Sequence, residues 1–290
     1  MNDMSPLVSK MSHFAENEGF NASSLEGVGV YKSSVSLQVT CDLYQAFICL
    51  VGQGEKICSV GDASFRYCTG DLFINFLPLP VDSEIVSSSV DKPFLSIALG
   101  INLAKLAEIT LRIDQASTSA GAGKCEPSSC VVVGKVEPDL LDAFDRLLKV
   151  AYCEMDAKML GESIIDEIYY RILTSEQGDN LRRLLSQHGQ IQPISKVVNH
   201  IHSNIERTIK INELSNIANM SNTSFFNAFK GLMHVSPMQY IKASKLQKAQ
   251  SLIKQGEQAS SVSYRVGYNS FSQFSREYKR LFGYPPSQTV

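Results

Sequence analysis

The chain has 290 residues, 44% of them hydrophobic, which is enough for two domains that each bury a core. It contains no run of 18 apolar residues, and its first residues lack the apolar segment of a signal peptide, so we expect neither a membrane span nor secretion. Its seven cysteines follow no regular spacing. These features predict a cytoplasmic protein with reduced thiols.

Charge is distributed unevenly along the chain. Residues 190–290 contain twelve Lys and Arg against four Glu, a net charge of +8. The whole chain carries −2, so residues 1–189 carry −10. This asymmetry predicts a basic nucleic-acid-binding domain joined to an acidic domain.

The first part of the chain has the pattern of a small β-structure. We expect residues 1–24 to form a frayed or locally docked arm. Short β-like runs then alternate with turn residues, which predicts a small barrel or sandwich whose interior holds one small ligand. The expected strands are 28–39, 44–52, 56–60, 64–68, 71–77, 84–90 and 94–99.

Two sets of residues in this region are candidates for sensing. Aromatic side chains could bind a small apolar ligand, the alternative being that they fill the core; they are Phe47, Phe65, Phe73, Phe76 and Phe94. Thiols could react with an aldehyde or an oxidant, the alternative being that they are small buried apolar groups. These thiols are Cys41, Cys49, Cys58, Cys68, Cys125 and Cys130.

Motifs of enzymes are missing from the sequence. A metal centre in the barrel would need clustered His and carboxylate ligands, but none of the five histidines lies between residues 14 and 187. No P-loop, GxGxxG or nucleophile motif is present. We therefore expect no enzymatic activity, no metal and no cofactor.

From residue 102 the apolar period becomes helical. We expect helices at 102–113, from Pro138 onward and at 160–173, separated by a loop at 117–129. Such amphipathic helices bury one another, the barrel or a second subunit. Residues 25–185 would thus form one domain, with the barrel at 28–100, helices at 102–185 and a polar connection at 176–189.

The last hundred residues contain a repeated helical unit. Residues 221–234 align with 270–283, so that Phe225 matches Phe274 and Phe229 matches Tyr278. The expected helices are 194–205, 213–218 with Asn212 as N-cap, 222–232, 237–255, 258–266 and 270–282, with turns at 219–221 and at Gly267. This order predicts two helix-turn-helix units in residues 190–290.

The helix that connects the two units sets their separation. About 20 residues span about 30 Å at about 1.5 Å per residue. One turn of B-DNA measures about 34–36 Å, so two reading helices at the ends of this rod would enter successive major grooves.

The motifs of the two units resemble the DNA-binding domain of the AraC/XylS family of bacterial transcription regulators. The resembling residues are Phe229-Lys230, Ser236-Pro237, Tyr240-Ile241, Gly267-Tyr268, Ser272, Phe274-Ser275-Arg276, Tyr278-Lys279 and Phe282-Gly283. Residues 70–80 and 164–173 are similar to the subtype found in regulators of aldehyde-reducing enzymes. The resemblance implies an α+β fold, in which a cupin-like β-barrel with dimerisation helices precedes an all-α double helix-turn-helix domain.

The resemblance also implies roles for individual residues and partners. It places Thr223, Phe226, Asn227, Ser272, Gln273, Ser275 and Arg276 near base edges, and Ser224, Lys230 and Lys279 near phosphates. Phe226 could instead pack beside Phe225. The implied partners are promoter DNA, RNA polymerase, a small-molecule effector and a second copy of the chain. The alternative function is a protein-interaction or anti-regulator module that kept the fold without binding DNA.

Three positions depart from the family pattern. His234 stands where a turn glycine is usual, Lys245 replaces an Arg of the connecting helix, and Asn227 replaces an outward Arg or His. A non-glycine residue in a left-handed turn costs about 1 kcal/mol. Asn pairs well with adenine and Arg with guanine, so Asn227 predicts a changed base preference.

Overall fold

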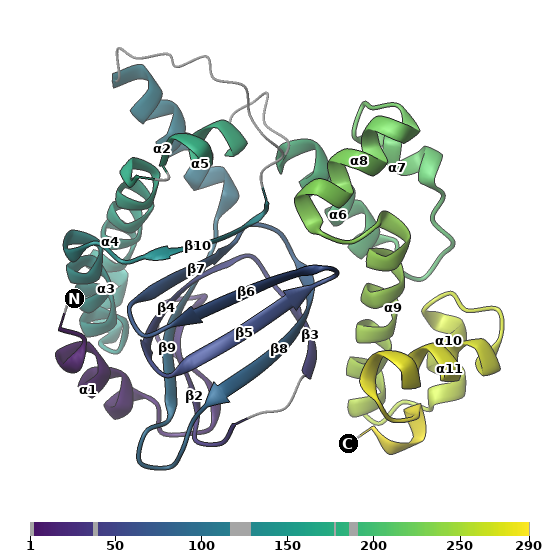
Figure 1. The fold of residues 1–290 in the computed structure, drawn as a ribbon, viewed down its shortest axis with the longest axis horizontal. Helices are drawn as coiled ribbons and strands as arrows, with labels where there is room; N and C mark the ends of the chain where they lie inside the picture. Colours follow the sequence, from purple (N-terminus) through teal and green to yellow (C-terminus); the bar gives the residue numbers. More distant parts are fainter. Residues whose placement is uncertain (1–2, 37–39, 117–128, 177, 186–190, 290) are drawn as a thin grey trace.

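The computed structural model describes residues 3–36, 40–116, 129–176, 178–185 and 191–289. Figure 1 shows two antiparallel sheets, one in front of the other, with helices on their left and a helical domain on their right. The α+β fold expected from the sequence is therefore confirmed.

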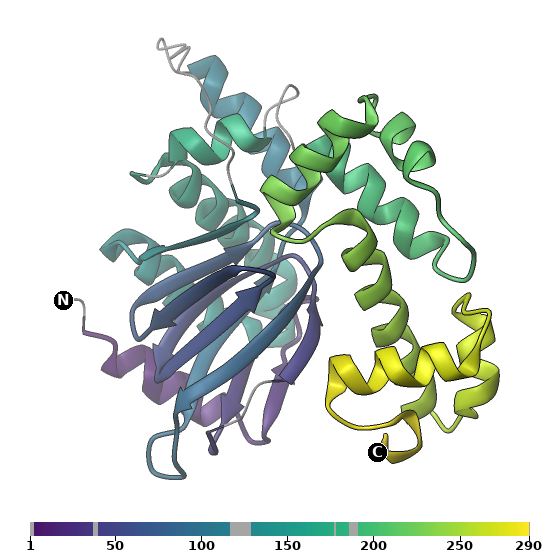
Figure 2. The same ribbon diagram turned by 45° about the vertical axis from the view of Figure 1, so that its right-hand side comes forward.

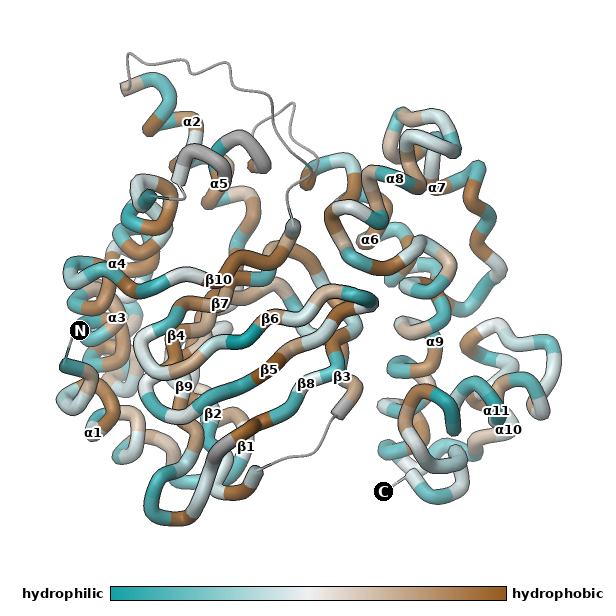
Figure 3. The backbone as a smooth tube through the Cα atoms, in the orientation of Figure 1, coloured by the Kyte–Doolittle hydropathy of each residue, from teal (hydrophilic) through white to brown (hydrophobic). Residues whose placement is uncertain are grey.

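The described residues of the N-terminal domain form ten strands in two antiparallel sheets, which we call the barrel. The six-stranded sheet has the order β1-β2-β9-β4-β7-β10 and the four-stranded sheet the order β3-β8-β5-β6. Their bounds are β1 Gly19–Ala22, β2 Val28–Ser33, β3 Thr40–Tyr44, β4 Phe47–Gln53, β5 Glu55–Val60, β6 Ala63–Cys68, β7 Asp71–Asn75, β8 Leu79–Ser87, β9 Phe94–Gly100 and β10 Val131–Lys135. Apolar segments run along β4, β7 and β10 in the middle of the molecule (Figure 3).

The seven expected strands were too few. β1, β3 and β10 were missed, and the expected strand 28–39 ends at Ser33. β8 begins at Leu79 rather than at residue 84 and includes Pro80. Pro80 pairs only with Leu43 of β3, because the pairing of β8 with β5 begins at Asp82. Its missing N–H group therefore faces an unpaired side of the strand.

The N-terminal arm is docked on the barrel. Helix α1, Ser5–Phe14, buries Leu7 and Met11, and the Phe14 ring stacks on Tyr152 at 3.7 Å between ring centres. An ion pair of 2.5 Å between Lys10 and Asp145 ties the same helix to α3, Pro138–Ala151. Of the two states expected for residues 1–24, the structure shows the docked one.

The described residues of the N-terminal domain form four more helices: α2 Leu103–Ala116, α3 Pro138–Ala151, α4 Glu154–Thr174 and α5 Gly178–Leu185. Helix α4 begins before the expected residue 160. Helix α5 lies in the segment expected to be a polar connection, because Leu181 and Leu185, one turn apart, are both buried. Most of the expected loop 117–129 lies outside the described residues.

The C-terminal domain consists of α6 Ile191–Ser203, α7 Ile211–Ile217, α8 Asn222–Met233, α9 Pro237–Lys254, α10 Ala259–Arg265, α11 Phe271–Phe282 and a short 3-10 helix, Pro286–Gln288. Side chains of Ser221, Ser236 and Ser270 cap α8, α9 and α11. The prediction of Asn212 as an N-cap is wrong, since Lys210 holds that position. Asn212 instead accepts a hydrogen bond of 2.7 Å from Asn222 and so joins α7 to α8.

The core of the first helix-turn-helix unit is continuous with that of the barrel. Phe225, Phe229 and Tyr240 belong to the same buried apolar cluster as the barrel strands, whereas Phe274 and Tyr278 belong to a separate cluster around the far half of α9. The Tyr240 hydroxyl donates a hydrogen bond of 2.9 Å to the Pro78 carbonyl. Figure 2 shows α11 beside the barrel, at the end of α9 opposite to α8. The first unit is thus built into the N-terminal domain, and the second is connected more loosely.

Candidate functional site

Helix α8 presents a polar face to solvent. Phe225 and Phe229 are fully buried and fix the rotation of the helix. Phe226 is 42% exposed, so part of its side chain is accessible from solvent, and this exposure is compatible both with a base contact and with packing beside Phe225. All five residues expected to contact DNA from this helix are exposed: Thr223, Ser224, Phe226, Asn227 and Lys230.

Helix α11 has the same organisation. Phe274 and Tyr278 are fully buried, which turns the opposite face outward. Of the residues expected to contact DNA, Ser275 is half-buried and the others are exposed; these are Ser272, Gln273, Arg276 and Lys279. Gln273 donates a hydrogen bond of 3.3 Å to Glu277 on the next turn.

The barrel approaches the side of α11 and not its reading face. Glu277 and Arg280 line a cleft of about 210 Å³ whose other wall includes Cys41 and Asp82 of the barrel. Glu277 is held there by an ion pair of 3.0 Å with Lys242 and by the Tyr268 hydroxyl. Arg276 and Lys279 do not line this cleft, so both are accessible to a duplex.

Lys245 is a structural residue. It is only 8% exposed, and its ammonium group donates to the carbonyls of Arg207 and Gly267 at 3.2 and 3.4 Å. Burial lowers its pKa. Gly267 has φ 78°, and a Cβ there would lie 2.5 Å from the Lys245 ammonium and 2.9 Å from the Glu206 carbonyl. Lys245 thus connects the loop between α6 and α7, through Arg207, to the turn of the second unit at Gly267. Its position in the sequence did not predict this role.

Ionic contacts position the helices before α8. Arg207 and His200 both hydrogen-bond the Glu213 carboxylate, and with Arg207 as the main cause they lower its pKa to about 2. His200 and Glu213 belong to α6 and α7, so this cluster fixes the angle between the two helices.

His234 connects the end of α8 to the barrel. It has the left-handed conformation expected at this turn, with φ 59°. Its Nε2 atom lies 2.7 Å from Ser129 Oγ, and its ring is 5.5 Å from that of Phe65. One residue further on, the Cys130 amide donates to the Leu232 carbonyl at 3.0 Å. Sequence reasoning identified the strained position but not this contact between domains.

The thiols of the barrel are in environments that oppose ionisation. Burial raises the pKa of Cys41 to about 12 and that of Cys49 to about 11, and it also raises those of Cys58, Cys68 and Cys130. The thiolate is the reactive form, so these five groups are poor nucleophiles near neutral pH. Cys125 lies outside the described residues. Cys153, which was not among the candidates, is exposed.

The five aromatic candidates do not surround one common pocket. Phe47 and Phe73 contact each other inside the barrel at 5.7 Å between ring centres. Phe65 meets His234, and Phe94 lies 5.9 Å from the Lys56 ammonium group. Phe73, Phe76 and Phe94 are each only 1% exposed, so their main role is to fill the core.

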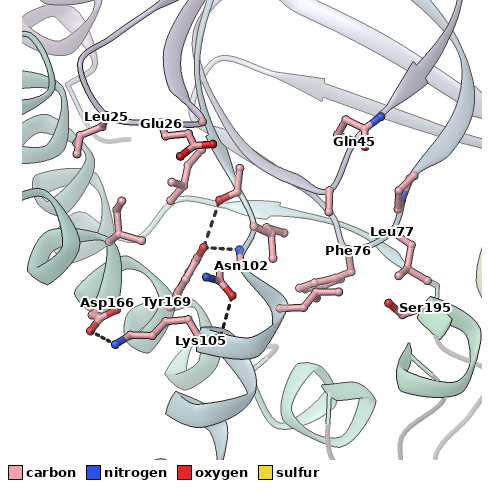
Figure 4. Close-up of a pocket in the computed structure, with 18 of the residues that line it drawn as sticks. Leu25, Glu26, Gln45, Phe76, Leu77, Asn102, Lys105, Asp166, Tyr169 and Ser195 are labelled. Atoms are coloured by element: carbon pink, nitrogen blue, oxygen red, sulfur yellow. Dashed lines mark hydrogen bonds and ion pairs between the residues drawn. The ribbon is translucent and has the colours of Figure 1, made fainter. Parts of the chain in front are cut away.

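Phe76 instead lines a cavity of about 760 Å³ at the junction of the domains. In Figure 4, Leu25 and Glu26 lie on one side of this cavity, and Phe76, Leu77 and Ser195 of α6 lie on the other. Tyr169 between them donates to the Gly100 carbonyl at 3.2 Å and accepts from the Asn102 amide at 3.0 Å. A volume of this size suits a small organic ligand.

A barrel followed by two helix-turn-helix units with exposed polar faces is the organisation of a DNA-binding regulator. Residues 24–180 match the family model of the AraC-type transcriptional regulator N-terminus, and residues 214–290 match that of a helix-turn-helix domain. The chain belongs to the family of AraC-type transcriptional regulators, which are regulators and not enzymes.

Individual relatives agree with this assignment. The chain is 32% identical over 91 residues to the probable transcriptional regulator LumQ of Photobacterium leiognathi, covering 31% of this chain and 37% of LumQ. It is 24% identical over 138 residues to the XylDLEGF operon transcriptional activator 2 of Pseudomonas putida, covering 45% of this chain and 88% of that protein. Apo ToxT from Vibrio cholerae has the same fold, with a TM-score of 0.59 at 12% identity over 94% of this chain and 98% of ToxT.

Two properties of the described residues concern membranes and metals. No helix there combines the length and apolar character needed to cross a bilayer. No three His, Cys, Asp or Glu side chains of that part of the chain are grouped so that they could hold a metal ion.

Proposed function

We propose that this protein is an effector-responsive transcription regulator that binds promoter DNA through α8 and α11. The observation that carries the proposal is the exposure of a polar and basic face on both helices, at opposite ends of α9. Helix α9 has 18 residues. At about 1.5 Å per residue α9 measures about 27 Å. The helices α8 and α11 at its two ends have a width of their own, so the distance between them approaches one DNA turn of about 34–36 Å.

The exposed residues have the chemistry for both kinds of DNA contact. Asn227 and Arg276 present the side chains that pair best with adenine and guanine in the major groove. Lys230 and Lys279 supply charge for phosphates, which fix the position of the protein on the duplex without specifying sequence. The net charge of +8 in residues 190–290 supports this interface over a module that lost DNA affinity.

A second copy of the chain is the proposed partner of α4. Met155 and Met159 are 68% and 71% exposed, and Tyr170 further along the same face is 51% exposed. Apolar groups this exposed on one helix face indicate an interaction site. A dimer through α4 would bring two DNA-binding domains to one promoter. RNA polymerase is the further partner that we propose at the promoter, and the cytoplasm is the proposed location of the protein.

The effector is proposed to be a small amphipathic molecule. One solved structure of ToxT holds an unsaturated fatty acid, which supports ligand binding by this fold. In the present chain the junction cavity of about 760 Å³ is the best place for such a molecule.

The test is binding of the full chain to duplexes selected from random DNA, measured by gel shift at several salt concentrations. We expect affinity to fall by orders of magnitude between about 50 and 200 mM salt, because phosphate contacts release counterions. The double variant Arg276→Ala/Lys279→Ala should lose most of the binding. Failure to enrich any sequence at low salt would favour the alternative, a protein-interaction module.

A further inference from the structure

We propose that the junction cavity binds an organic cation with an apolar body, and that this cation is the effector. The inference rests on the proposed function and names the ligand class of the regulator. It depends on three features: the shape of the cavity, the charge of its lining, and its direct connection to the DNA-binding domain.

The cavity has an acidic end and a mostly apolar end that also includes Gln45 and Ser195. Apolar side chains of the barrel and of the strand ends form one part of its wall, and these are Phe76, Leu77, Pro78, Leu99 and Ile101. The other part comes from the turn before β2 and from α4, with Leu25, Glu26, Glu162 and Asp166. This division suits a molecule with one apolar and one charged or hydrogen-bonding end.

The lining is acidic. Its charged groups are three carboxylates, Glu26, Glu162 and Asp166, and a single ammonium, that of Lys105. Lys105 already forms an ion pair of 3.1 Å with Asp166. No ion pair within 4.0 Å is formed by Glu26 or Glu162 in the described part of the chain. Asp166 and, to a smaller extent, the charge of Glu162 nevertheless raise the pKa of Lys105. Three carboxylates against one ammonium leave the acidic end with a net negative charge that attracts a cation and repels an anion.

Packing of α4 on the turn before β2 holds Glu26 and Glu162 on the same wall. A Cβ at Gly161 would lie 2.5 Å from Leu25 Cδ2, so α4 packs directly on the Leu25 side chain, in the turn before β2. Glu162 follows Gly161 and Glu26 follows Leu25. The contact therefore brings two acidic residues that are distant in sequence to one end of the cavity.

The opposite wall belongs to the DNA-binding domain. Ser195 and Asn199 of α6 line the cavity. Pro78, another lining residue, accepts the hydrogen bond of the Tyr240 hydroxyl of α9. The same hydroxyl lies 2.8 Å from His202 Nε2 of α6. A ligand that shifts Pro78 or α6 would therefore act directly on the helix that spaces the two reading helices.

The experiment measures binding of three probes with the same apolar body to the full chain by calorimetry: 4-phenylbutylamine, 4-phenylbutanol and 4-phenylbutyrate. We expect the amine to bind at least about tenfold more tightly than the alcohol, and the acid to bind more weakly than both. The double variant Glu26→Gln/Glu162→Gln should reduce the amine to the affinity of the alcohol. Both residues are exposed, so this variant is expected to fold.

A second variant tests whether the probes bind in the junction cavity. Asn199→Trp should weaken all three probes because the indole fills the cavity, whereas Ser203→Trp at the exposed end of the same helix should change none. Preference for the acid, binding that survives both cavity variants, or no binding of any probe would overturn the proposal. These measurements need no DNA, so their outcome is independent of the gel shift. A failure of the gel shift would reject the proposed function without rejecting the ligand site.

Discussion

The imidazole of His234 lies 2.7 Å from the hydroxyl of Ser129, and this hydrogen bond joins the end of the first reading helix to the barrel. His234 takes a left-handed conformation that favours glycine, with φ 59°. Its backbone carbonyl also packs closely on Gly61, in the turn between β5 and β6. The side chain that causes strain in the turn is thus the one that docks the two domains.

Replacing His234 by glycine should therefore destabilise the protein although it relieves strain. The relief is about 1 kcal/mol, but the variant loses a hydrogen bond and the ring contact with Phe65, each worth about 0.5–1.5 kcal/mol, and gains backbone entropy in the unfolded chain. We expect a net loss of about 1–2 kcal/mol in the free energy of unfolding, measured in urea.

Asn219→Gly is the matched control. Asn219 also has a positive φ, 55°, but its side chain is exposed. We expect its stability to stay within about 0.5 kcal/mol of the unsubstituted protein. Equal effects of the two glycine variants would show that the His234 side chain contributes nothing to docking.

Domain docking should weaken in mild acid. Burial lowers the pKa of both His234 and His202. Because their pKa values in the folded chain lie below the ordinary value of about 6.5, the unfolded chain binds more protons as the pH falls. Their contribution to stability is fully present above about pH 6.5 and is lost as the pH falls through the lowered pKa.

The measurement is the urea midpoint between about pH 7.5 and pH 5.5, where we expect a decrease. The double variant His202→Gln/His234→Gln should flatten the profile in this window. Glu213 does not interfere, since its pKa of about 2 places its own loss of stabilisation in more acidic solution. An unchanged slope in the double variant would assign the pH dependence to other groups.

Arg276 and Lys279 should differ in what they contribute to DNA binding. If Arg276 reads a base, Arg276→Ala costs about 1–3 kcal/mol on the preferred sequence and relaxes the preference at one position. Lys279→Ala should weaken binding to all sequences alike and reduce the salt dependence by about one phosphate contact. Gel shifts on the selected duplex and on a scrambled duplex separate the two effects. An equal loss on both duplexes for Arg276→Ala would contradict base reading.

Local features of the sequence were sufficient to predict the C-terminal domain. The capping box of Ser236 and Gln239 and the buried aromatic pair Phe274 and Tyr278 depend on residues three or four positions apart. Such spacings determine helix starts and inner faces without information about the rest of the chain. The outward position of the expected DNA contacts followed directly.

Features that depend on contacts between distant residues could not be predicted. β10 exists because Val131–Lys135 pair with β7, and Ser129 meets His234 across the domain boundary. The junction cavity likewise combines residues of the barrel, α4 and α6. The residue pattern of any one of these segments contains no information about the distant segment that it contacts. In the sequence, the aromatic residues of the barrel were therefore the best available indication of a ligand site.

Thiol reactivity should follow exposure. Exposed Cys153 is expected to react first with a disulfide reagent at neutral pH, whereas Cys49, Cys58 and Cys130 are buried and should react only after unfolding. The reaction is followed in a Cys125→Ser variant, so that Cys125 does not add to the number of modified thiols. The same reaction in urea gives the total number of thiols. Fast modification of Cys58 in the folded protein, with a change in DNA affinity, would restore the hypothesis of electrophile sensing.

Asn227 should set the base preference of the first reading helix. It is exposed on α8, next to Phe226, which is 42% exposed, and two residues before the buried Phe229. Asparagine makes a bidentate contact with adenine and arginine with guanine. Asn227→Arg is therefore expected to change the preferred base at one position from adenine to guanine, with a discrimination of about 1–3 kcal/mol.

Selection from random DNA with both proteins would show this change directly. The control is Asn222→Arg: Asn222 hydrogen-bonds Ser215 and Asn212 in the scaffold of α7 and α8, so its replacement should lower affinity without exchanging one base for another. If Asn227→Arg keeps the original preference at every position, Asn227 does not contact a base, and the specificity of the first half-site must come from Thr223 or Phe226.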